Sequence, residues 1–146
     1  MVTLYHYTSK ENVQQILDKG LIPLSNYESF TELRKEVIFC WLSPKDQKIF
    51  ADDAVCLEIT VEEDRCMVAE MDYISLSMMY KYGGVKFGGK NLPINPEAST
   101  LFARLYEITA VPLSTYDDNF FTPEVLVKGA IRAESIKLLN VSDHQH

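Results

Sequence analysis

The sequence predicts a single α+β domain. Two observations support this class: the expected strands outnumber the expected helices, and the two kinds of element do not alternate regularly along the chain. A chain of 146 residues that is 47% hydrophobic is long enough to bury one compact core. We therefore expect one domain over residues 1–141 and a short tail over 142–146.

The N-terminal region predicts a strand that turns directly into a helix. Residues 2–7, VTLYHY, are apolar and aromatic, as in a strand. Ser9 is placed to cap the helix that follows, whose apolar residues recur at i, i+3 and i+4 from Val13. Gly20 ends this helix, because glycine adopts the left-handed conformation of a helix end at little cost.

The remaining elements follow from apolar runs and from the residues that break them. Runs of β-branched and aromatic residues predict strands, and Ser43-Pro44 stops the second of them. Gly83-Gly84 breaks a helical stretch that follows the fourth strand. The expected strands after the first are 37–42, 54–61, 67–71, 105–111, 124–129 and 136–141, and the further expected helices are 72–82 and 97–103.

Composition limits the partners and the compartment. The formal net charge of −7 opposes non-specific binding to nucleic acid, although the glycine-rich stretch KYGGVKFGGK is a locally positive loop. No apolar run approaches the roughly 20 residues that cross a bilayer, and the N-terminus lacks a signal-peptide pattern. The 3 cysteines match no zinc or redox motif. We expect a cytoplasmic protein without membrane contact, and no metal site, since His144 and His146 offer only two ligands.

A few polar residues at element boundaries are candidates for a functional site. His6 is the only histidine before the tail, and it shares a strand with Thr8. Asn12 lies in the first turn of the following helix, and Glu124 begins an apolar strand directly after a polar, aromatic loop. Each residue also has an ordinary structural role: a satisfied histidine, a turn residue, an exposed helix position and a solvated strand end. Their combination is more informative than any one of them.

The combination resembles the opening of ADP-ribosyltransferases, particularly the DarT-type toxins that modify DNA. In that family a strand with His-x-Thr precedes an asparagine and an Ile-Leu-x-x-Gly-Leu helix end, and YHYTSKENVQQILDKGLIP carries this pattern. VIFCWLSPKDQKIF is similar to the family's aromatic strand, and PEVLVKGAIRAESIKLL to the segment with its catalytic glutamate. The resemblance covers both ends of the chain and one central strand. The matching residues at the opening are His6, Thr8, Asn12, Ile16, Leu17, Gly20 and Leu21.

The resemblance implies two small packed β-sheets with flanking helices and an NAD cleft between the sheets. NAD would be the substrate that donates ADP-ribose, with release of nicotinamide. Glu124 would bind the nicotinamide ribose and stabilise its oxocarbenium-like centre, a demand shared with glycoside cleavage. His6 and Thr8 would hold the adenosine-side ribose, and Asn12 the pyrophosphate or the nicotinamide ribose. Further NAD-binding candidates are Tyr7, Arg34, Trp41 and Ser43, of which Tyr7 and Trp41 are equally expected in the core.

Two segments differ from the family or leave its acceptor open. The family uses an arginine between its first two motifs, and this chain offers only Arg34, in the charged stretch TELRKE, where a solvated helix or loop is also expected. The loop STYDDNFFT lies where many such enzymes contact the acceptor. Its Tyr116, Phe120 and Phe121 would stack on a base, grip a protein surface or pin the loop to the core. The acceptor is then a DNA base, an RNA or a protein side chain, and a toxin or a factor in phage–host conflict fits such an enzyme.

Two other functions stay open for the same pattern. An NAD-dependent RNA 2′-phosphotransferase shares the opening strand and the cleft, but it needs several arginines around an RNA phosphate, and the four arginines here are scattered in sequence. A non-catalytic binding or inhibitor module is the other alternative, because one fold hosts unrelated functions. The presence of His6, Thr8 and Glu124 together favours the transferase.

Overall fold

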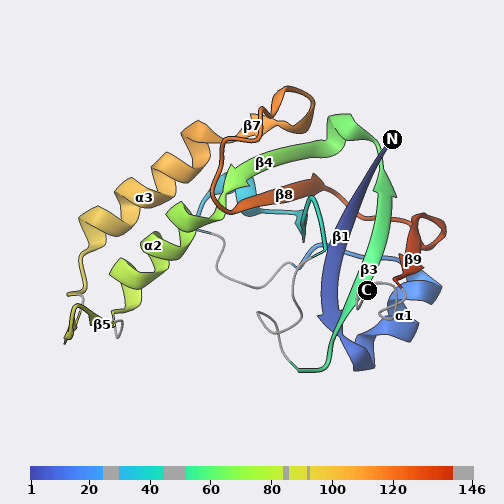
Figure 1. Ribbon diagram of the computed structural model, residues 1–146, viewed down its shortest axis with the longest axis horizontal. Helices are drawn as coiled ribbons and strands as arrows, with labels where there is room; N and C mark the ends of the chain where they lie inside the picture. The colour runs from blue at the N-terminus through green and yellow to red at the C-terminus, as the bar shows by residue number, and fades with distance from the viewer. Residues whose placement is uncertain (25–29, 45–51, 84–85, 92, 140–146) are drawn as a thin grey trace.

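The chain folds into two antiparallel sheets and few helices (Figure 1). The computed structural model describes residues 1–24, 30–44, 52–83, 86–91 and 93–139. The first sheet contains, in spatial order, β1 (Val2–Ser9), β3 (Ala54–Val61) and β9 (Ile136–Leu138). The second sheet contains β2 (Val37–Cys40), β8 (Pro123–Lys128), β4 (Cys66–Glu70) and β7 (Val111–Pro112). The α-helices of the described residues are α1 (Val13–Lys19), α2 (Met71–Tyr82) and α3 (Pro96–Thr109), and β5 (Lys86–Phe87) pairs with β6 (Lys90–Asn91).

The main apolar core lies between the two sheets. Side chains alternate in direction along a strand, so Val125 and Val127 of β8 join this core while Leu126 points to the opposite face. Leu57 and Ile59 of β3 contribute to the core from the first sheet, and both are fully buried. On the other face of the second sheet, Leu126 packs in a second cluster with residues of α2 and α3. Figure 1 shows this helix pair and the first sheet on opposite sides of the second sheet.

The two sheets meet where an edge strand of each comes alongside the other. The backbone N–H of Tyr5 donates to the Trp41 carbonyl at 2.9 Å, and the N–H of Trp41 donates to the Tyr5 carbonyl at 2.7 Å. Tyr5 lies on β1, and Trp41 directly follows β2. This pair of hydrogen bonds brings His6 next to the end of β2.

Gly20 ends α1 at a point where the chain touches another backbone. Its φ of 87° is left-handed, and a Cβ at this position would lie 2.3 Å from the carbonyl oxygen of Ile131. The next residue, Leu21, exchanges two backbone hydrogen bonds of 2.9 Å with Ile131. Glycine is therefore required both by the backbone conformation and by the close approach.

Several expectations from the sequence are confirmed and several are wrong. The strands expected at 2–7, 37–42, 54–61, 67–71 and 124–129 and the helix at 72–82 are present within a few residues. The strand expected over 105–111 is wrong, because α3 continues to Thr109 and its buried residues follow helical spacing. Ser9 makes no side-chain capping bond, since a 3-10 turn separates it from α1. The glycine-rich loop contains the β5–β6 hairpin. The tail 142–146 lies outside the described residues.

No helix in the described part of the chain has the length and apolar character needed to cross a membrane.

Substitution of Gly20 tests the end of α1. Gly20→Ala should lower the free energy of unfolding by at least about 3 kcal/mol, because the added Cβ meets the Ile131 carbonyl in a left-handed backbone. Gly88→Ala is the matched control: φ is 59°, but nothing lies within 4 Å of the added Cβ, so only about 1 kcal/mol should be lost. Urea unfolding measures both values. Equal losses would show that the contact with Ile131 is unimportant.

Candidate functional site

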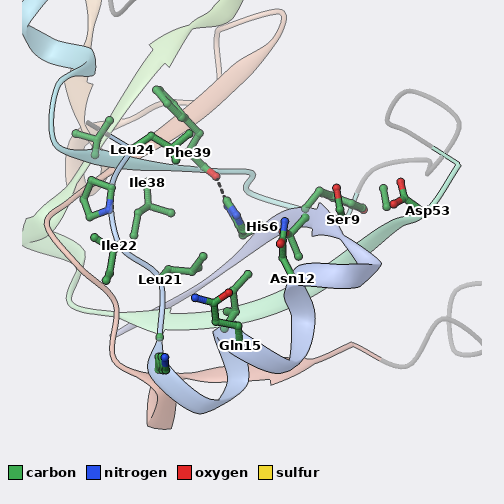
Figure 2. Close-up of a pocket in the computed structure, with 18 residues that line it drawn as sticks. His6, Ser9, Asn12, Gln15, Leu21, Ile22, Leu24, Ile38, Phe39 and Asp53 are labelled. Atoms are coloured by element: carbon green, nitrogen blue, oxygen red, sulfur yellow. Dashed lines mark hydrogen bonds between the residues drawn. The ribbon is translucent and has the colours of Figure 1, made fainter. Parts of the chain in front are cut away.

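A cavity of about 610 Å³ lies at the strand-to-helix turn near the N-terminus. Its volume falls within the roughly 300–1,000 Å³ of pockets that bind small molecules and cofactors. The walls are the end of β1, one face of α1, the segment 20–24 and all but the last residue of β2, with Asp53 and Ala54 at one end (Figure 2). The predicted residues that line this cavity are His6, Tyr7, Thr8 and Asn12.

His6 lies among these walls, with its ring between Phe39 and the α1 side of the cavity (Figure 2). Its Nδ1 lies 2.7 Å from the carbonyl oxygen of Phe39, which can only accept, so Nδ1 carries the proton. Burial lowers the pKa of His6, and the hydrogen bond to Phe39 opposes this only in part. The imidazole is therefore neutral near pH 7, and its Nε2 is an acceptor that makes no hydrogen bond with the described residues.

Polar side chains from one face of α1 and from the turn before it line the cavity. Asn12, Gln15 and Lys19 line the cavity at i, i+3 and i+7, and all three are exposed. Asn12 makes no capping bond to the helix, so its amide group is available to a ligand. Among the described residues, Lys19 is the only lysine or arginine in the cavity wall. The wall thus combines an acceptor, two amides, one cation and the carboxylate of Asp53.

Glu124 lies elsewhere, in a buried polar cluster on the second sheet. Its carboxylate is paired with Arg34, whose Nη1 contacts Oε1. The hydroxyl of Tyr106 donates to the same Oε1 at 2.5 Å and accepts from Arg34 at 3.1 Å. Only 3% of Glu124 and 8% of Arg34 are exposed. The solvated position considered for Glu124 is therefore wrong, and in the charged stretch TELRKE solvent exposure is wrong for Arg34, while Glu32, Lys35 and Glu36 are exposed. The oxygen Oε2 makes no hydrogen bond with the described residues.

Tyr106 was not predicted as a site residue, because the sequence assigned its segment to a strand. It is fully buried, and burial together with the nearby Glu124 carboxylate raises the pKa of its hydroxyl far above the usual range. The hydroxyl therefore stays protonated and donates to Glu124. Tyr106 lies on α3, 18 residues before Glu124, so its position could be found only with the correct helix period.

Phe39 connects the cavity with the Glu124 cluster. Its carbonyl accepts the hydrogen bond of His6, and it lines the cavity. The guanidinium carbon of Arg34 lies 4.3 Å from the centre of its ring. Arg34 and Glu124 do not line the cavity themselves. The structure thus places the predicted residues in two groups, and Phe39 contacts both, through its carbonyl at His6 and its ring at Arg34.

Trp41 and Ser43, predicted beside NAD, do not line the cavity. Trp41 is half-buried and joins the sheets through its backbone pair with Tyr5, and Ser43 is exposed. No arginine of the described residues lines the cavity either. Among the described residues no three histidine, cysteine, aspartate or glutamate side chains gather as metal ligands.

The predicted acceptor loop is anchored on one side and exposed on the other. The rings of Tyr116 and Phe120 lie 5.2 Å apart and pack against the core, and the Tyr116 hydroxyl accepts from the Phe120 N–H at 3.3 Å. Phe121 is 93% exposed. Two of the predicted aromatic residues therefore pin the loop, and Phe121 alone projects from it.

Glu70 holds this loop and was not predicted. Its carboxylate is buried and accepts from two consecutive backbone N–H groups, those of Phe121 at 2.7 Å and Thr122 at 2.9 Å. The N–H of Met71 donates to the Thr122 carbonyl at 2.9 Å. The end of β4 thereby fixes the chain two residues before Glu124.

The titration of His6 gives a test of its buried, neutral state. Because its pKa is lowered in the folded protein, the unfolded chain binds the proton more readily. Its stabilising contribution is full above its ordinary pKa of 6.5 and is lost as the pH falls below that value. Wild type should lose more free energy of unfolding between pH 7 and pH 5 than His6→Asn, which retains a donor for Phe39 but does not titrate. Urea unfolding at both pH values measures the difference, and equal losses would contradict burial of a neutral His6.

Replacement of Glu70 tests the fixed loop. Glu70→Gln retains the size of the side chain but leaves one acceptor for two N–H groups. Hydrogen exchange at Phe121 or Thr122 should accelerate by about tenfold or more, and the free energy of unfolding should fall by about 1–3 kcal/mol. Glu63→Gln, at an exposed position, is the matched control. Unchanged exchange at both amides would show that the carboxylate does not fix the loop.

Comparisons with known proteins found no protein similar to this chain. No protein-family model, curated protein or solved structure matches the chain. Its function is therefore inferred from its own residues and contacts.

Proposed function

We propose that the protein is an ADP-ribosyltransferase that takes ADP-ribose from NAD and releases nicotinamide. The observation that carries this proposal is the position of Phe39, which contacts both the neutral histidine of a nucleotide-sized cavity and the arginine that is paired with a buried carboxylate. The carboxylate lies close to the cavity wall, because Arg34 contacts both Phe39 and Glu124. Two small antiparallel sheets around these residues are compatible with the ADP-ribosyltransferase fold.

The cavity suits the adenosine half of NAD. The Nε2 of His6 accepts from a ribose hydroxyl, since Nδ1 is already committed to Phe39. Thr8 and Asn12 offer further polar groups to the same ribose and its phosphate. Lys19 is the cation in the cavity wall that neutralises part of the pyrophosphate charge. Apolar residues of the segment 20–24 face the base.

Glu124 supplies the charge that the transfer reaction needs. When the bond between ribose C1′ and the nicotinamide nitrogen breaks, the electron pair leaves with nicotinamide and positive charge develops on the ribose. A carboxylate held beside that ribose stabilises the charge, and a nucleophile of the acceptor then attacks C1′ and loses its proton. Tyr106 holds Oε1 by a hydrogen bond, so Oε2 is the carboxylate oxygen that accepts from the ribose.

A second candidate function is supported by one observation. Glu124 is 3% exposed and ion-paired, as a structural carboxylate is. A nucleotide-binding module without catalysis needs the cavity and His6 but not a free carboxylate. This candidate differs from the transferase in one result: NAD binds but is not consumed.

Transfer from labelled NAD tests the proposal. The protein is incubated with NAD labelled in the adenylate half, together with cell lysate, total nucleic acid or buffer. Label should appear on a macromolecular fraction with release of nicotinamide, and Glu124→Gln should lower the rate by at least about 100-fold. Glu134→Gln, which replaces an exposed carboxylate that is also paired with an arginine, should leave the rate unchanged. Thermal unfolding confirms that each variant is folded.

Three outcomes separate the candidates. Equal rates for wild type and Glu124→Gln would remove Glu124 from the reaction. Binding of NAD by calorimetry without nicotinamide release would assign the binding module. Neither binding nor release from a folded sample would overturn both functions.

A further inference from the structure

We propose that the ion pair between Arg34 and Glu124 is a closed state of the site, and that the pyrophosphate of the ligand opens it by drawing Arg34 away. Ligand binding then frees the carboxylate that the reaction uses. This inference rests on the proposed function, because it names the regulation of the same site. It concerns the exchange of one guanidinium group between two anions.

Arg34 is placed for such an exchange. Its Nη1 contacts Glu124, while its guanidinium carbon lies over the ring of Phe39, a residue of the cavity wall. The other arginine side chains are engaged elsewhere or exposed: Arg65 binds the carbonyls of Lys128 and Ala130, and Arg104 and Arg132 are exposed. A guanidinium group binds carboxylate and phosphate with the same planar fork of donors, so the two anions compete for it.

The backbone that carries Arg34 is a short 3-10 turn that belongs to neither sheet. Arg34 ends a 3-10 turn of three residues, Glu32–Arg34, whose N–H···O distances are 3.1 and 3.3 Å. Two flanking residues, Phe30 and Glu36, have left-handed φ values of 66° and 56° although neither is glycine. Such conformations are strained and often occur where a segment changes its arrangement. A shift of this turn moves Arg34 and breaks no strand pairing, because residues 32–34 pair with no strand.

The rest of the cluster keeps Glu124 in place after Arg34 leaves. The hydroxyl of Tyr106 donates to Oε1 at 2.5 Å. Tyr106 lies on α3, so it does not move with the turn that carries Arg34. The carboxylate therefore retains one hydrogen bond and its orientation, and loses the cation that neutralised it. In the closed state Arg34 cancels the negative charge that an oxocarbenium-like ribose requires, and in the open state that charge is available.

The closed pair also has a measurable effect on affinity. A ligand that binds only the open state has its apparent affinity reduced by the fraction of molecules that are open. If about one molecule in ten is open, removal of the closed state tightens binding about tenfold. The gain is confined to ligands with a pyrophosphate, since adenosine has no group that draws Arg34.

Calorimetry with ADP and adenosine tests the exchange without any turnover. Both probes lack nicotinamide, so binding is measured apart from chemistry. Glu124→Gln should bind ADP about tenfold more tightly than wild type and should bind adenosine equally well. The double variant Arg34→Lys/Glu124→Gln keeps the positive charge but loses the planar fork, so most of the gain for ADP should disappear. Glu134→Gln should match wild type with both probes.

Each result decides the proposal. Equal ADP affinity in wild type and Glu124→Gln, or a gain shared by adenosine, would overturn the exchange and leave the transferase to its own assay. If the double variant still binds ADP more tightly than wild type, the gain comes from the change in charge alone, and the exchange is overturned. Absence of ADP binding to any folded variant would overturn both the exchange and the dinucleotide site.

Discussion

Two backbone hydrogen bonds between Tyr5 and Trp41 hold the edges of the two sheets together, and the candidate site depends on this junction. They are the described bridge between β1 and the end of β2. Because of it, His6 lies close enough to bind the carbonyl of Phe39, and the turn into α1 faces β2 across the cavity. Side chains at the junction can vary with little effect on it, since the bonds are made by backbone atoms. The junction that supports the site is therefore made by the backbone of residue 41 and does not require a tryptophan side chain.

Two buried carboxylates flank the same part of the second sheet, and the fold stabilises them in different ways. Glu70 receives two backbone N–H groups and no described cation, so its charge is balanced by dipoles. Glu124 receives a guanidinium group and a hydroxyl. A carboxylate held by backbone dipoles cannot be released without moving the chain, whereas one held by a long side chain can. This difference fits a fixed role for Glu70 and a changeable environment for Glu124.

Local patterns in the sequence were enough to predict most of the strands and the position of His6. Alternation in β3, the breakers at Ser43-Pro44 and Gly83, and the glycine at the end of α1 all act over a few residues. The contacts of the Glu124 cluster act over 72 and 90 residues, and nothing local indicates that Arg34 is buried. Tyr106 was not predicted as a site residue because an apolar run of this length fits either a strand or a helix. Glu70 was missed because a glutamate at a strand end is usually solvated.

The exposed face of α1 has a consequence for how this protein can diverge. Asn12, Gln15 and Lys19 line the cavity but belong to neither apolar cluster, whereas Ile16 on the same helix is part of the core. Substitutions at the first three positions therefore change the chemistry offered to a ligand at little cost in folding. Ile16 and Gly20, by contrast, constrain the helix that presents them. Selection can retune ligand preference through these three surface positions while the scaffold and the His6–Phe39 contact stay the same.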